Sequence, residues 1–298
     1  MADLAASVLA KLKNKAKESG ISYQQCLQLF FQEEFLRRLA ASKYKDNFVL
    51  KGGLLIYTLT NFESRATVDV DFMLRGITND LNRMDAIISE ILSVSTGNDF
   101  ITFKAAPTEP IAVNRKYHGV STQITGYIKN VRVPFNVDIG VGDVIVPAAK
   151  ARTIKTQLDG FDTPEIMTYS LESTVAEKLD AILQRFELTG RMKDFYDIYY
   201  LSQTFDFDGS KLCSAIAETL RNRGTEYNSE SFERVKSLVD NETVRSRWRY
   251  FLRTLRNPEI PFEVVMNGIV VFIGPVWDAL IEDKEFRKQW HADKSNWA

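Results

Sequence analysis

The feature that most constrains this chain is the alternation of apolar and acidic residues in TVDVDFML, residues 67–74. Successive side chains of a β-strand point to opposite faces, so this period of two predicts a strand with one buried and one polar face. Val68 and the apolar residues that alternate with it would pack into a core, and Asp69 and Asp71 would share the other face. We therefore expect a strand that presents two carboxylates side by side.

Two carboxylates this close repel each other unless a cation lies between them. Oxygen ligands of this kind suit Mg²⁺, which usually binds one or two carboxylates together with phosphate oxygens. A solvated strand face is the alternative, and the apolar flanks favour the metal site. In FNVDIGVGD, residues 135–143, Asp138 lies in a second apolar strand. It would either join Asp69 and Asp71 in a three-carboxylate cluster for two metal ions or cap a turn before Gly140.

A short apolar strand, Phe48-Val49-Leu50, runs into Lys51-Gly52-Gly53, and a helix is expected from Leu54 to about Asn61. Glycines let the backbone approach a phosphate closely, and the free N–H groups at a helix N-terminus favour an anion. A Gly-Gly pair between a strand and a helix is also a common tight turn. The pair points to phosphate binding only in combination with the carboxylates.

The second half of the chain carries further charged residues on expected helices. Lys178 lies beside an apolar stripe in LESTVAEKLDAILQR, and Asp194 and Asp197 are three residues apart in RMKDFYDIYYL, so they share a helix face. Each has a structural alternative, since Asp194 could cap a helix and Lys178 could be a surface lysine. Charges placed opposite a triphosphate are nevertheless what phosphoryl-type transfer requires.

The pattern of elements predicts an α/β (α+β) protein with an N-terminal helical arm (1–46), a core (47–150) and a helical C-terminal domain (151–298). The expected helices are 3–17, 22–42, 79–94, 171–188, 193–203, 210–223, 229–239 and 243–256, and the expected strands include 100–105, 119–128 and 131–141. The tail from 262 to 290 reads either as a buried helix interrupted near Gly274-Pro275 or as a strand and turn.

Composition excludes several classes. A net charge of −1 gives no global attraction for nucleic acid, and two cysteines, Cys26 and Cys213, form no CxxC pair. The N-terminus has no signal-peptide pattern, and no run of roughly 18 apolar residues is expected to span a membrane. We expect a cytoplasmic protein with no membrane partner.

One local concentration of positive charge stands out in TVRSRWRYFLRTLRN, residues 243–257. At about 100° per residue, four arginines of this helix fall on one stripe, and Trp248 falls on the neighbouring, buried arc. The stripe could hold an RNA backbone, or it could be a solvated face paired with acidic residues. The four arginines are Arg245, Arg249, Arg253 and Arg256.

Taken in order, these motifs resemble the AbiEii/AbiGii toxin family over about residues 45–203. This family comprises the nucleotidyltransferase-like toxins of type IV toxin–antitoxin and abortive-infection systems. The resemblance implies a polymerase-β-like nucleotidyltransferase core with a mixed sheet, an N-terminal helical arm and a helical C-terminal half. Many superfamily members have serine where this chain has Gly53, which removes one hydroxyl contact to phosphate but leaves the backbone donors.

The resemblance also implies transfer of a nucleoside monophosphate from an NTP, with release of pyrophosphate. The acceptor would be a tRNA 3′ end, which we favour, or a protein side chain, as in a protein nucleotidylyltransferase; an inactive nucleotide- or antitoxin-binding module is the remaining alternative. A cognate antitoxin is the implied protein partner. The implied roles are Mg²⁺ or Mn²⁺ binding by Asp69 and Asp71; a ligand or base at Asp138; phosphate binding by Gly52, Gly53 and Lys178; nucleotide binding by Arg65 and Asp197; and orientation of the acceptor or nucleotide by Asp194.

Overall fold

The computed structural model describes residues 3–111, 119–255 and 260–298, and the chain divides into two compact units. Unit 1 comprises Met1–Gly142 and Lys150–Thr168, and unit 2 comprises Asp143–Ala149 and Tyr169–Ala298. The expected boundaries at 46 and 150 do not coincide with this division. The N-terminal helices belong to the core of unit 1, and residues 150–168 return to its sheet.

Unit 1 is built on a mixed sheet, as expected. Its strands follow the order β3-β5-β6-β2-β1-β8-β7, with β4 paired to β5. The pairs β2–β6 and β1–β8 are parallel, and the other pairs are antiparallel. The bounds are β1 (Phe48–Lys51), β2 (Val70–Leu74), β3 (Thr102–Ala105), β4 (Glu109–Ile111), β5 (Gly119–Ile128), β6 (Val131–Gly140), β7 (Lys150–Thr153) and β8 (Glu165–Thr168).

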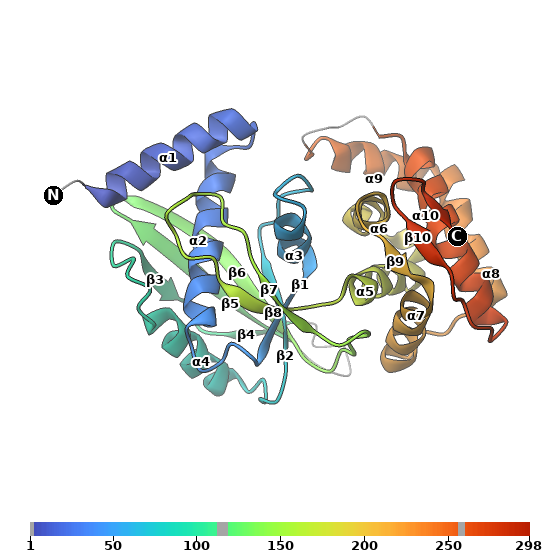
Figure 1. Ribbon diagram of the computed structural model, residues 1–298, viewed down its shortest axis with the longest axis horizontal. Coiled ribbons are helices and arrows are strands. Elements are labelled where there is room, and N and C mark those ends of the chain that lie inside the picture. The colour runs from blue at the N-terminus through green and yellow to red at the C-terminus, as the bar shows by residue number, and fades with distance from the viewer. Residues whose placement is uncertain (1–2, 112–118, 256–259) are drawn as a thin grey trace. The chain divides into compact units, whose positions relative to one another are not determined.

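Helices α2 and α4 lie along one face of this sheet (Figure 1). Helix α2 is a core helix and not a separate arm, because the Phe35 ring contacts the rings of Phe72 and Phe135 on the sheet. Its N-terminus is fixed by a capping box between Ser22 and Gln25. The helices of unit 1 are α1 (Leu4–Ser19), α2 (Tyr23–Ala40), α3 (Gly52–Leu59) and α4 (Leu81–Ser93).

The strand expected over 67–74 is shorter in the structure. β2 begins at Val70, and Val68 is 61% exposed instead of buried. The alternation is real from Val70 onward, where Val70 and Phe72 are buried and Asp71 is half-buried. The prediction that Val68 packs into the core was therefore wrong, because residues 67–69 precede the strand.

Unit 2 is largely helical, which confirms the helices expected between 171 and 256. They are α5 (Leu171–Leu183), α6 (Met192–Thr204), α7 (Gly209–Arg223), α8 (Ser229–Lys236) and α9 (Glu242–Leu252), with 3₁₀ turns η1 (Phe186–Leu188) and η2 (Ser237–Asp240). A small antiparallel sheet joins β9 (Phe207–Asp208), β10 (Gln289–His291) and β11 (Asn296–Trp297). Strands of two or three residues carry too little periodicity to be predicted.

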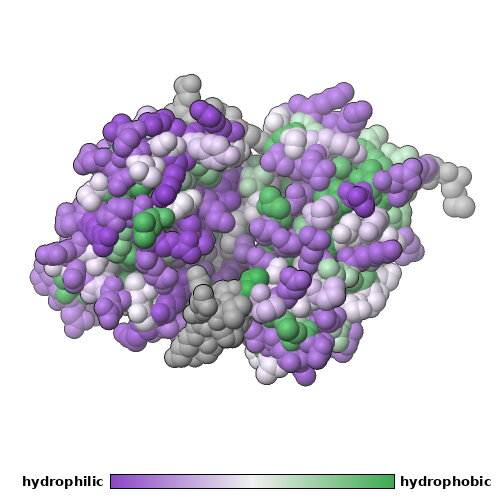
Figure 2. Space-filling view, turned by 180° about the vertical axis from the view of Figure 1, so that it is seen from behind, coloured by the Kyte–Doolittle hydropathy of each residue, from purple (hydrophilic) through white to green (hydrophobic). Residues whose placement is uncertain are grey.

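The ambiguous tail is resolved as one helix, α10 (Phe262–Ile281), which continues through Pro275. By length and composition alone, with a mean hydropathy of 1.9, α10 meets the criterion for a helix that could cross a membrane, a criterion that the core helix of a globular protein also meets. In the structure its aromatic side chains pack within unit 2: Trp277 stacks on Phe232, and Phe272 contacts Trp290. Hydrophilic residues make up most of the molecular face seen in Figure 2.

Candidate functional site

A row of polar side chains crosses four neighbouring strands of unit 1. Ser121 on β5 pairs in register with Asp138 on β6, Asp138 pairs with Asp71 on β2, and Asp71 pairs with Lys51 on β1. Residues paired in register point to the same face of a sheet. The Asp138 carboxylate accepts a hydrogen bond from Ser121 Oγ at 2.6 Å. The sheet therefore places Asp71 and Asp138 side by side, which is one of the two arrangements expected for Asp138, with a lysine and a serine beyond them.

The glycine pair lies directly against this row. Gly52 begins α3 with a φ of +69°, and a Cβ at this position would lie 2.1 Å from Asp71 Oδ2. A Cβ on Gly53 would lie 2.8 Å from Thr67 Oγ1 and 3.5 Å from Arg65 Nη1. The structure thus brings Gly52, Gly53, Arg65 and Asp71 together, and only glycine leaves space for the Asp71 carboxylate.

The N-terminus of α3 differs from several other helix starts in the chain. Its N-cap residue, Lys51, makes no side-chain capping bond. By contrast, Ser22, Asp80 and Ser170 cap α2, α4 and α5. The first N–H groups of a helix favour an anion when no side chain takes them. This end of α3 therefore suits a phosphate beside the carboxylates.

Asp69 lies just before β2, and its Oδ1 accepts a hydrogen bond from Asn136 Nδ2 at 3.3 Å. Within residues 3–111, 119–255 and 260–298, no three His, Cys, Asp or Glu side chains form a group that could hold a metal ion. What the sheet provides is the neighbouring pair Asp71 and Asp138, a donor set that fits Mg²⁺ when phosphate oxygens complete its shell. The role of Asp69 as a third ligand stays a prediction.

Four side chains of this region escaped the sequence reasoning. Ser121 and Asn136 could have been predicted. Asn136 lies two residues before Asp138 on the same strand face, and Ser121 is the register partner of Asp138 on β5. Gln28 and Gln32, which donate to the Val68 carbonyl, lie one turn apart on a mostly apolar helix. Nothing in the sequence links that helix to residue 68, since the contact is purely tertiary.

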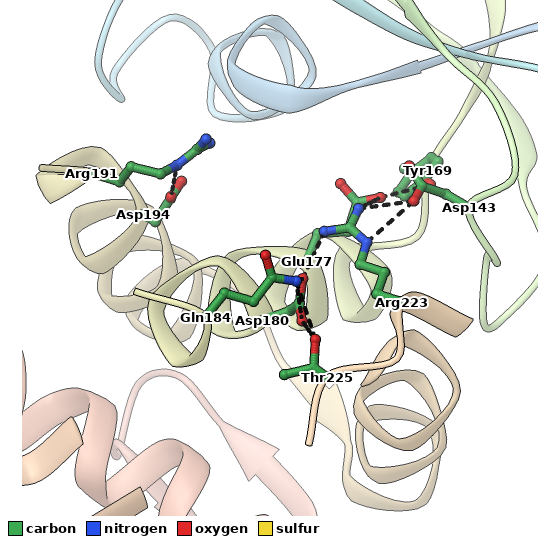
Figure 3. Close-up of polar contacts among 9 residues, drawn as sticks. All are labelled: Asp143, Tyr169, Glu177, Asp180, Gln184, Arg191, Asp194, Arg223 and Thr225. Atoms are coloured by element: carbon green, nitrogen blue, oxygen red, sulfur yellow. Dashed lines mark hydrogen bonds and ion pairs between the residues drawn. The ribbon is translucent and has the colours of Figure 1, made fainter. Parts of the chain in front are cut away.

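In unit 2, the charged residues expected near the substrate form a connected set. Lys178 Nζ lies 2.5 Å from Asp197 Oδ2 and 3.3 Å from Asp194 Oδ1. The other oxygen of Asp194 accepts from Arg191 Nε at 2.5 Å (Figure 3). Both aspartate side chains are 1% exposed and that of Lys178 is 10% exposed. Lys178 is thus neither a surface lysine nor an isolated charge, because two buried aspartates hold it.

A second ionic cluster in unit 2 centres on Arg223 at the end of α7 (Figure 3). Its guanidinium contacts Asp143 at 2.9 Å, Glu177 at 3.0 Å and Asp180 at 3.0 Å. Burial alone would lower the pKa of Arg223, but these three carboxylates raise it above its ordinary value. Burial and the charge of Glu177 likewise raise the pKa of Tyr169 well above its ordinary value. The cluster fastens Asp143 to helices α5 and α7.

The expected arginine stripe is only partly described. Arg245 pairs with Glu263 at 2.9 Å and Arg249 pairs with Glu242 at 2.6 Å, and all four side chains are exposed. Arg253 is exposed just beyond the end of α9, and Arg256 lies outside the described residues. Trp248 is buried, as expected. For two of the four arginines, these contacts agree with the alternative interpretation, a solvated face paired with acidic residues.

Comparison with known proteins identifies the family. The family model of the AbiEii nucleotidyl transferase toxin of type IV toxin–antitoxin systems matches residues 34–283. The chain belongs to the AbiEii family. No curated protein sequence matches it. As an AbiEii-family member it is a nucleotidyltransferase-type toxin, and the resemblance found in the sequence is confirmed.

Two solved structures from Helicobacter pylori are similar to this AbiEii-family protein. JHP933 has a TM-score of 0.51 at 12% identity, covering 88% of this chain and 95% of its own. A protein described as a candidate nucleotidyltransferase has a TM-score of 0.47 at 11% identity, covering 96% of this chain and 100% of its own. At such identity the likeness to JHP933 speaks to the fold alone, which confirms the expected α/β architecture.

Proposed function

We propose that this protein is a Mg²⁺-dependent nucleotidyltransferase that transfers a nucleoside monophosphate from an NTP to the 3′ end of a tRNA. The observation that carries the proposal is the register pair Asp71–Asp138 with the Asp71 carboxylate against Gly52. Two hard oxygen ligands beside an uncapped helix N-terminus would suit a divalent metal ion that binds together with a triphosphate. Mn²⁺ has the same ligand preference and would substitute.

Different residues of unit 1 are proposed to bind the metal ion and the phosphates. Asp71 and Asp138 would hold the metal ion, with Asp69 as the further ligand. The backbone N–H groups of Gly52 and Gly53 would bind phosphate oxygens, and Arg65, whose guanidinium lies near Gly53, would add positive charge. When bound, Mg²⁺ supplies charge that stabilises the phosphate oxygens during transfer.

In the transfer step, the oxygen of the acceptor hydroxyl forms a bond to the α-phosphorus of the NTP. The bond from that phosphorus to the oxygen bridging to the β-phosphate breaks, and pyrophosphate leaves with the electron pair. Asp138 would accept the hydroxyl proton or, where it serves as a metal ligand, would leave that proton to solvent water. Ser121 orients its carboxylate in either role, through the hydrogen bond to Oδ1.

In unit 2, Lys178, Asp194 and Asp197 are proposed to serve the nucleotide and the acceptor as one ionic unit. Because Lys178 is held by both aspartates, the position of its ammonium within unit 2 is fixed. Asp194 would orient the acceptor or nucleotide through Arg191, to which it is also bonded. A cognate antitoxin follows from the family's place in type IV systems, and the cytoplasm is the compartment we propose.

A direct assay tests the proposal. The full chain is incubated with Mg²⁺, each of the four labelled NTPs, bulk tRNA and a cell lysate, and the labelled macromolecule and released pyrophosphate are measured. We expect labelled tRNA. Label confined to lysate proteins would show that the acceptor is a protein and not an RNA. Binding of NTP without transfer to any acceptor would indicate an inactive nucleotide- or antitoxin-binding module.

The Asp71→Ala variant provides the matching control. Loss of a metal ligand should slow transfer on the order of a thousandfold or more. The melting temperature should hold or rise, since the metal-free protein loses a repulsion between neighbouring carboxylates. Normal turnover in Asp71→Ala would contradict the metal assignment.

A further inference from the structure

The backbone carbonyl of Val68 is held by two side chains from another element. Its oxygen accepts hydrogen bonds from Gln28 Nε2 at 2.6 Å and from Gln32 Nε2 at 2.8 Å, both on α2. Residues four apart on a helix share a face, which is why both amides reach one acceptor. Gln28 is 8% exposed and Gln32 is 1% exposed, whereas the Val68 side chain is 61% exposed. Buried polar contacts, and not packing of Val68, fix this point of the chain.

The segment fixed in this way carries the first carboxylate of the site. Val68 lies between Thr67, whose side chain packs against Gly53, and Asp69, whose carboxylate accepts from Asn136. Residues 67–69 precede β2, so the ladder that orders Asp71 does not extend to Asp69. A shift of the Val68 carbonyl would therefore move Asp69 and Thr67 relative to Asp71 and Gly53.

We propose that Gln28 and Gln32 are positioning residues for nucleotidyl transfer, which set the place of Asp69 beside the metal site. This inference rests on the proposed function. Both glutamines precede residue 34, where the match to the AbiEii family begins. Removal of a group that orients a metal ligand without contacting the metal itself typically lowers metal affinity or activity 10–100-fold. A role confined to stability would leave metal affinity untouched.

Methionine is the replacement that separates these roles. It is close to glutamine in volume and helix propensity, but it cannot donate to the carbonyl. In Gln28→Met or Gln32→Met the carbonyl keeps one donor, so folding should be nearly unchanged. The double variant removes both donors. Gln24→Met is the matched control, because Gln24 is exposed on the same helix.

The experiment measures melting temperature, Mn²⁺ binding by electron paramagnetic resonance with a non-hydrolysable NTP, and the Mg²⁺ concentration for half-maximal transfer. We expect the double variant to bind Mn²⁺ about 10–100-fold more weakly than Gln24→Met and to need correspondingly more Mg²⁺, with partial recovery at high Mg²⁺. A folded double variant with the metal affinity of Gln24→Met would overturn the inference. If the double variant does not fold, Gln32→Met decides by the same comparison.

The outcome also separates this inference from the proposed function. Wild-type protein that neither binds Mn²⁺ nor transfers nucleotide would overturn both. Wild-type binding that is lost in Asp71→Ala but unchanged in the glutamine variants would keep the function and overturn only the positioning role.

Discussion

At Gly52, two separate constraints exclude a side chain. The backbone has a φ of +69°, and the Asp71 carboxylate occupies the space of a Cβ. The first constraint costs about 1–2 kcal/mol for an L-residue. The second must displace a carboxylate that we assign to the metal. The absence of a Cβ at Gly52 thus allows the Asp71 carboxylate to take its place in the site.

The variants Gly52→Ala and Gly20→Ala separate these two effects. Gly20 has a φ of +68° with nothing within 4 Å of a Cβ, so its replacement reports the backbone cost alone. We expect Gly20→Ala to lose about 1–2 kcal/mol of stability in urea unfolding and Gly52→Ala to lose more, and only Gly52→Ala to lose transfer activity. Equal activity in the two variants would show that Asp71 does not need its place against Gly52.

A second prediction at this scale concerns Glu33, which is fully buried. Burial raises its pKa to about 8, against the opposing charge of Arg37. Its Oε2 and the Oε1 of Gln157 both have no hydrogen-bond partner among the described residues. A carboxyl whose folded pKa is raised binds its proton more tightly in the folded state, so stability falls as pH rises from about 4.5 toward 8.

Glu33→Gln should remove this pH dependence. Its melting temperature should match wild type near pH 5 and exceed it at pH 9, with a difference in unfolding free energy on the order of a few kcal/mol. Glu18→Gln, at an exposed position on α1, is the control. A difference between wild type and Glu33→Gln that stays constant from pH 5 to pH 9 would mean that Glu33 stays ionised.

At the scale of elements, helices α5 and α6 are joined by Lys178 and its two aspartates. Asp194 and Asp197 are three apart on α6, so both carboxylates face the same point on α5. Removal of one partner from a buried ion pair leaves uncompensated charge and typically costs about 3–5 kcal/mol. The ionic unit therefore holds the two helices together.

Lys178→Ala should accordingly lower the melting temperature sharply and also weaken NTP use. Thermal unfolding and transfer kinetics, measured below the variant's own transition, distinguish the contributions. An unchanged KM for NTP in folded Lys178→Ala would make the lysine purely structural. Lys178→Arg is the companion variant, because a planar fork does not reproduce a compact ammonium between two carboxylates.

For the whole molecule, a net charge of −1 means that attraction to RNA must come from a local surface. The arginines around α9 are the surface that we propose for this role, and Arg245 and Arg249 each contact a glutamate. Exposed pairs of this kind contribute little and are screened by salt. They can therefore exchange their partners for phosphates.

The triple variant Arg249/Arg253/Arg256→Glu tests this surface. If the stripe binds tRNA, labelling of tRNA should collapse, and wild-type labelling should fall steeply with increasing salt. Circular dichroism and the melting temperature establish that the variant is folded. Undiminished tRNA labelling by the folded variant would contradict tRNA binding by the arginine stripe and would favour a protein acceptor.

Local sequence patterns were sufficient to predict many of the strands and helices of this protein. The alternation around Asp71 and Asp138 predicted two strands, and helical periodicity predicted α5 to α9. Gly52-Gly53 was correctly placed at a helix start. These features depend on neighbours within a few residues, because the side-chain directions of strands and helices repeat at fixed periods.

Which distant residues meet could not be predicted from local patterns, because it depends on how the elements pack. Strand order made Asp71 and Asp138 neighbours, and a return of residues 150–168 to the sheet moved the expected domain boundary. Val68, apolar and in phase, is exposed because it precedes β2, and its carbonyl accepts from Gln28 and Gln32 on a helix some forty residues earlier. Lys178 likewise became a buried ionic link once α6 packed on α5. Local patterns predicted most of the elements and their polar faces, whereas long-range contacts, which no local period encodes, selected their partners.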